Sequence, residues 1–153
     1  MRTFFKLVIA SLLLGLAGAA AAASDRGTPE EAVAMVKKVI DDIKKDGKEK
    51  VIQAIQAGSA RYKDRDLYVF ISGMDGVTRA NGANPQIAGK NLNDIKDADG
   101  KPIGKERFEL ARTKGKGWQE YRWPDPLTKE VRKKATYLEK YEDLVVSCGI
   151  YKD

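Results

Sequence analysis

Six side chains have the chemistry to hold a small anion: Arg79, Asn81, Tyr121, Trp123, Lys134 and Tyr137. Arg79 and Asn81 are two positions apart near the end of a predicted strand, so both should point to one face. A guanidinium is a planar donor that suits a carboxylate. Lys134 beside the hydroxyls of Tyr121 and Tyr137 would supply one charge and two neutral donors. The set predicts a site for a small carboxylate, walled by aromatic rings.

Each of these side chains also has a purely structural interpretation. Tyr121 and Trp123 could fill a core instead of lining a pocket. Lys134 could be a solvated strand end, and Arg79 could form a surface ion pair. The sequence leaves both interpretations open.

Other kinds of chemistry are excluded by composition. The chain has no histidine and one cysteine, Cys148, which removes Ser-His-Asp and Cys-His catalysis, His-ligated metals and an intrachain disulfide. Asp94, Asp97 and Asp99 lack the spacing of a calcium-binding EF-hand loop and are typical of a turn. We therefore predict no enzyme activity, no metal and no cofactor, and a small buried thiol at Cys148.

The first 23 residues have the pattern of a secretory signal peptide. Arg2 and Lys6 precede an apolar stretch over 7–16, and small residues follow over 17–23. The apolar stretch is shorter than the roughly 20 residues that span a bilayer. We predict a signal peptide over 1–23 and one domain over 24–153 that is periplasmic or secreted, with an uncleaved anchor as the alternative.

The charge balance does not change this interpretation. The formal net charge is +6, which in a cytosolic protein would suggest nucleic acid as a partner. An exported protein does not normally meet nucleic acid, so we expect none. A solvated surface of mixed charge accounts for the excess.

Two helices are predicted in the N-terminal part. Thr28 and Glu31 form a capping-box pattern around Pro29, which predicts a helix from Pro29 to about Lys45. A second helix is expected to end at Gly58. The apolar stripe of the first helix, formed by Val33, Val36, Ile40 and Ile43, either packs on a sheet or forms a homodimer contact.

The rest of the sequence predicts an antiparallel sheet. Strands are expected over 66–72, 77–81, 118–123, 134–140 and 144–151, with a short helix over 105–114. Alternation places Gln119, Tyr121 and Trp123 on one strand face and Trp118 on the other. The irregular segment 82–104 is rich in Gly, Asn and Asp, and a loop of this length favours a binding function.

Five motifs together resemble the single Cache domain family, a PAS-like group of extracytoplasmic sensor domains. They are LYVF followed by DG, ANPQIAGKNL, DADGKPI, GKGWQEYRWPDP and KKATYLEKYEDLVVSCGIY. The resemblance covers residues 29–152. It implies an α+β fold in which a five-stranded antiparallel sheet has a long N-terminal helix on one face and a small pocket on the other. In the family such pockets often bind small organic acids or amino acids.

Two departures from the family pattern affect the expected function. Many relatives carry a histidine near the position of Asn81, and no receptor output region follows Asp153. We therefore expect a stand-alone secreted domain that binds a small organic acid and is linked to signal transduction or chemotaxis. The alternative is a protein-interaction module without a small ligand that regulates a membrane receptor, kinase or transporter.

Overall fold

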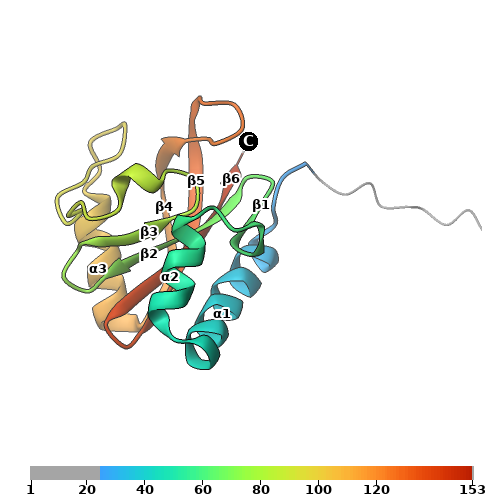
Figure 1. The fold of residues 1–153 in the computed structure, drawn as a ribbon. Helices are drawn as coiled ribbons and strands as arrows, with labels where there is room; N and C mark the ends of the chain where they lie inside the picture. Colours follow the sequence, from blue (N-terminus) through green and yellow to red (C-terminus); the bar gives the residue numbers. More distant parts are fainter. Residues whose placement is uncertain (1–24, 153) are drawn as a thin grey trace, which may run out of the picture.

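The computed structural model describes residues 25–152, so the predicted signal peptide over 1–23 lies outside the described residues. Two helices come first, and one further α-helix separates the first three strands from the last three (Figure 1). The elements are α1 (Pro29–Asp46), α2 (Lys48–Gln56), η1 (Ala60–Tyr62), β1 (Lys63–Asp64), β2 (Leu67–Gly73), β3 (Thr78–Asn81), η2 (Pro85–Ile87), α3 (Ile103–Lys114), β4 (Lys116–Pro124), β5 (Val131–Tyr141) and β6 (Leu144–Lys152).

Five strands form one antiparallel sheet in the order β3-β2-β6-β5-β4. The two-residue strand β1 adds to the same edge of β2 as β3 does. The predicted five-stranded sheet is therefore confirmed, and β1 is an addition that the sequence did not indicate. The β2–β6 pairing, with Val69 opposite Cys148, joins segments that are far apart in the chain.

Helix α1 begins as its sequence predicts. The Thr28 hydroxyl accepts a hydrogen bond from the Glu31 amide at 3.2 Å, and the Glu31 carboxylate accepts one from the Thr28 amide at 2.8 Å. These two bonds satisfy amides that the first helical turn leaves unpaired. Gly47, with φ of 89°, ends the helix one residue after Asp46.

The two faces of the sheet are covered differently. Helices α1 and α2 pack on one face, where Val36, Ile40 and Ile43 join the main core with residues of β2, β5 and β6. On the other face, Phe108 and Ala111 of α3 pack on Leu138 and Val145. The apolar stripe of α1 therefore packs on the sheet, and a homodimer contact through this helix stays a prediction.

Cys148 lies in the main core, as predicted. It is free and fully buried, and burial raises the pKa of its thiol to about 12. A thiol protonated at neutral pH is a poor nucleophile, so Cys148 acts as a small apolar side chain.

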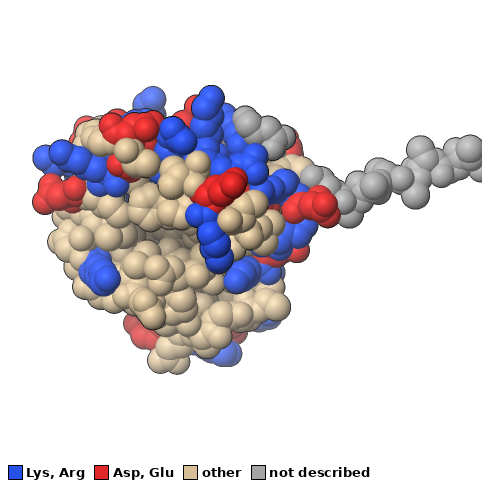
Figure 2. Space-filling model, turned by 90° about the horizontal axis from the view of Figure 1, so that it is seen from above, with Lys and Arg blue, Asp and Glu red and all other residues tan. Residues whose placement is uncertain are grey.

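The surface seen from above in Figure 2 mixes both signs of charge. Lys and Arg side chains are interspersed with Asp and Glu along the upper part of this face, while its lower part is mainly uncharged. None of the helices within residues 25–152 is long and apolar enough to cross a membrane.

A cluster around Asp42 links α1 to η1. The Asp42 carboxylate accepts hydrogen bonds from the Arg61 guanidinium at 2.5 Å, from Lys38 at 3.0 Å and from the Tyr62 hydroxyl at 3.0 Å. The bond from Arg61 is the largest of the effects that lower the Asp42 pKa to about 2. A carboxylate with a depressed pKa stabilises the fold above its unfolded pKa, and this contribution is lost as pH falls through the folded value.

Asp42→Asn should therefore destabilise the protein at pH 7 by about 1–2 kcal/mol, because Arg61 is partly exposed and solvent screens the pair. The difference from wild type should shrink as pH falls from 3.8 toward about 2. Urea denaturation at pH 7, at pH 3.8 and at about pH 2 measures the stability difference and its decrease. Asp41→Asn is the control, since Asp41 is exposed and pairs only with Lys44 on the same helix. An equal loss in both variants would contradict the assignment.

Candidate functional site

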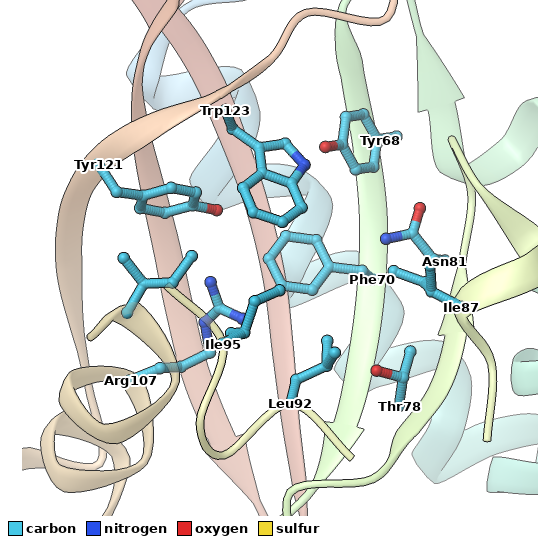
Figure 3. Close-up of a pocket in the computed structure, with 11 residues that line it drawn as sticks. Tyr68, Phe70, Thr78, Asn81, Ile87, Leu92, Ile95, Arg107, Tyr121 and Trp123 are labelled. Carbon is cyan, nitrogen blue, oxygen red and sulfur yellow. The ribbon is translucent and has the colours of Figure 1, made fainter. Parts of the chain in front are cut away.

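A partly open cavity lies between the sheet, α3 and the loop over residues 82–102, which connects β3 to α3 (Figure 3). Its volume is about 20 Å³, which is room for about one water molecule. We call it the inner cavity. It is lined by Tyr68, Phe70, Thr78, Asn81, Ile87, Leu92, Ile95, Ile103, Arg107, Tyr121 and Trp123.

Arg107 gives the inner cavity a positive charge. Its side chain projects from α3 into the cavity (Figure 3), and the residue is only 3% exposed. The centre of its guanidinium lies 5.0 Å from the ring centre of Phe70 and 5.6 Å from that of Tyr121. Within residues 25–152 its Nε has no hydrogen-bond partner, and no carboxylate pairs with it. A buried cation without an anion is costly, so this arrangement favours an anionic occupant.

A second buried basic side chain, Lys134, lies behind the cavity wall. Lys134 is opposite Tyr121 in the β4–β5 register. Its ammonium donates hydrogen bonds to the hydroxyl oxygens of Tyr68 at 2.5 Å and Tyr151 at 3.3 Å. Its pKa is lowered to about 7, chiefly by burial and to a smaller extent by the charge of Arg107. Lys134 does not itself line the inner cavity, because Tyr68 lies between them.

The Lys134 contact prepares the Tyr68 hydroxyl to act as a donor. The Tyr151 hydroxyl donates a hydrogen bond to the Pro124 carbonyl at 2.7 Å, so its oxygen can accept hydrogen bonds from other groups. Tyr68 accepts from the Lys134 ammonium, and its nearest protein acceptor, the Tyr151 oxygen, is 3.4 Å away. The Tyr68 hydroxyl can therefore donate to an anion in the cavity.

Two further polar groups face the cavity from β3. The Asn81 side-chain oxygen accepts hydrogen bonds from the amides of Ala83 at 2.9 Å and Asn84 at 2.8 Å. This leaves the Asn81 NH₂ group directed toward the cavity (Figure 3). The Thr78 hydroxyl is buried without a hydrogen-bond partner in the described part of the chain. Both groups can bind a polar ligand atom without adding charge.

Three of the six residues predicted to form the site line the inner cavity: Asn81, Tyr121 and Trp123. The alternation predicted for β4 is confirmed, because Trp118 pairs with Tyr137 on the α1 face while Tyr121 pairs with Lys134 on the cavity face. The Tyr121 hydroxyl is fixed by Thr136 at 2.9 Å.

The structure does not bring Tyr137 and Arg79 into this group. Tyr137 lies three positions from Lys134 on β5, so the two side chains point to opposite faces. Its hydroxyl donates to Glu139, and its ring lies 5.5 Å from that of Trp118. Arg79 pairs with Asp75 at 2.7 Å, the surface ion pair that was the alternative interpretation. These placements correct the expected grouping of both residues.

Sequence reasoning missed Arg107, although a signal was present. Ile103, Arg107 and Ala111 are four positions apart, so they share one face of α3, and all three are buried. A charged residue on the buried stripe of a helix indicates a functional position. No such signal existed for Tyr68 and Phe70, because β2 is buried on both faces and shows no alternation. Within residues 25–152, no three metal-ligating side chains are grouped.

Similar proteins are sensors of chemotaxis systems. The chain is 31% identical over 103 residues to the methyl-accepting chemotaxis protein McpP of Pseudomonas putida, a match that covers 66% of this chain and 19% of that protein. A chemotaxis protein of Vibrio parahaemolyticus has a similar fold, with a TM-score of 0.70 and 23% identity over 81% of this chain and 88% of that one.

A second solved structure is described as showing the basis for carboxylic acid recognition by a Cache chemosensory domain. Its TM-score is 0.69, with 22% identity over 81% of this chain and 92% of that one. The family model of single Cache domain 2 matches residues 19–153, which is most of the sequence. The chain therefore belongs to the single Cache domain family.

Proposed function

We propose that this protein is an extracytoplasmic sensor domain that binds a small carboxylate in the inner cavity. The observation that carries the proposal is Arg107, a buried guanidinium that faces the cavity and has no carboxylate partner among the described residues. A carboxylate would neutralise this charge and form charge-assisted hydrogen bonds with it. Single Cache domains are ligand-binding sensors, so no catalytic step is needed.

The remaining lining suits a small acid with an apolar body. The Tyr68 hydroxyl and the Asn81 NH₂ group would complete the hydrogen bonds to the carboxylate. Ile87, Leu92 and Ile95 of the loop would contact the carbon chain. Because the inner cavity has room for about one water molecule, the loop over 82–102 must move outward to admit a ligand.

The similar proteins support a sensory role. McpP is a methyl-accepting chemotaxis protein, and a structure of similar fold is described in terms of carboxylic acid recognition. We propose that the movement of the loop is detected by a membrane receptor or kinase. This chain spans 19% of the length of McpP, so the partner that receives the signal is part of the proposal.

A thermal-shift comparison of acids with their neutral amides tests the proposal. Acetate and propionate should raise the melting temperature, whereas acetamide and propionamide should not, because only the anions neutralise Arg107. A ligand present at one hundred times its dissociation constant should stabilise the fold by about 2.7 kcal/mol. Equal shifts with acids and amides would contradict a site selected by charge.

The interaction-module alternative is favoured by one observation, the small free volume of the inner cavity. If the aromatic side chains fill this space permanently, no carboxylate will shift the melting temperature. Saturating acetate and propionate together with longer and branched acids should then leave the protein unchanged. That outcome would favour a protein partner over a small ligand.

A further inference from the structure

A second cavity adjoins the inner cavity on its outer side. Its volume is about 360 Å³. We call it the outer cavity. It is lined by Tyr68, Asn81, Ala83, Asn84, Ile87, Trp123, Pro124, Asp125, Pro126 and Lys129. Four of these residues also line the inner cavity: Tyr68, Asn81, Ile87 and Trp123. These four side chains form the partition between the two spaces.

Trp123 is the least restrained polar member of this partition. Tyr68 is held by the Lys134 ammonium, and the Asn81 side chain is held by two backbone amides. The Trp123 indole makes no hydrogen bond within residues 25–152. Its ring contact is an edge-on approach to Tyr121 with centroids 6.0 Å apart. Trp123 is also half-buried, while Tyr121 is 7% exposed.

The indole of Trp123 lies across the cavity between Tyr121 and Tyr68 in Figure 3. Trp123 is followed by Pro124, Asp125 and Pro126, which line the outer cavity. Its large flat side chain therefore stands where the inner cavity ends and the outer cavity begins. A smaller side chain at this position would join the two spaces.

We propose that Trp123 determines ligand specificity by limiting the length of the carbon chain that the inner cavity accepts. This inference rests on the proposed function, because Arg107 is taken to hold the carboxylate at the other end. With the carboxylate at Arg107 and the loop over 82–102 moved outward, a short chain would lie below the indole. A longer chain has to displace the indole toward the outer cavity.

The affinity profile across straight-chain acids gives the test. Burial of each additional methylene group improves affinity about fourfold where space allows. In the wild-type protein the gain should stop after the short acids, because the indole blocks the chain. In Trp123→Ala it should continue through the longer acids, so hexanoate should bind at least tenfold more tightly to the variant than to the wild type.

Isothermal titration calorimetry of acetate, propionate, butyrate, pentanoate and hexanoate measures these profiles with the purified protein. Trp118→Ala is the matched control, because Trp118 lies on the same strand, faces the opposite side of the sheet and is 41% exposed. It should keep the wild-type profile. Circular dichroism verifies folding, and Trp123→Leu, which keeps an apolar side chain on β4, carries the same test if Trp123→Ala does not fold.

The outcomes separate this inference from the proposed function. If wild type and Trp123 variants bind short acids with the same dependence on chain length, Trp123 does not set the limit and the inference is overturned, while the carboxylate site stands. If neither protein binds any acid of the series, the proposed function fails and the inference fails with it. An extended profile in Trp118→Ala would also overturn the inference, since the effect would not be local to the cavity.

Discussion

Arg107→Met should abolish carboxylate binding and at the same time make the unliganded protein more stable. The buried guanidinium has no anionic partner among the described residues, so its burial is compensated only by the rings of Phe70 and Tyr121. Methionine has a similar length without the charge. We expect a gain of about 1–2 kcal/mol in the free energy of unfolding and a loss of affinity of at least about thirtyfold.

The opposite signs of these two effects distinguish a ligand anchor from a structural arginine. Melting temperatures with and without propionate, together with calorimetric affinities, measure both quantities. Arg112→Met is the matched control, because Arg112 is an exposed residue of the same helix that pairs with Glu109. A less stable variant that still binds propionate would show that Arg107 supports the fold and not the ligand.

Lys134→Met should stabilise the protein most at neutral pH, with an advantage that declines as the pH rises. In the folded protein the pKa of Lys134 is lowered to about 7 from 10.5, chiefly by burial. Between these two values the unfolded chain carries the proton and the folded protein does not. Stability of the wild type should therefore increase with pH across this window, by at most about 1.4 kcal/mol per pH unit.

The variant lacks this dependence, so it should exceed the wild type by about 4 kcal/mol at pH 7 and by about 2 kcal/mol at pH 9. Cys148 sets the upper pH limit of this measurement. Its pKa rises from 9.0 to about 12 on folding, so it destabilises the fold above pH 9. Urea denaturation at pH 7, 8 and 9 gives the two slopes. Lys133→Met, at the exposed neighbouring position, should follow the wild type. Parallel slopes for wild type and Lys134→Met would show that Lys134 stays charged when buried.

The fold was largely predictable because its signals are local. The cap at Thr28, the alternation in β4 and the turns between strands depend on neighbouring residues, and all three are confirmed. The strand β1 was missed because two residues of polar sequence give no periodicity. Its pairing with β2 depends on contacts far apart in the chain.

The candidate site was less predictable because it is assembled across elements. The pairing of Tyr121 with Lys134 depends on the register between β4 and β5, which the hydrophobic pattern sets only together with the geometry of the connecting turn. The separation of Lys134 from Tyr137 could be predicted from the sequence, because residues an odd number of positions apart on one strand point to opposite faces. The role of Tyr68 was not available, because β2 is buried on both sides and only the position of α3 decides which face meets the cavity.

The central position of β6 has a consequence for the order in which the molecule assembles. This strand follows all its neighbours in the sequence, yet among the strands of residues 25–152 it alone joins β2 to β5. Until residues 144–152 are available, the β4–β5 hairpin stays separate from β2 and its partners β1 and β3, because no other strand within residues 25–152 links the two groups. Non-local pairing of this kind slows folding. A partly synthesised chain would therefore remain open, and the proposed binding site would be completed only in the last step of folding.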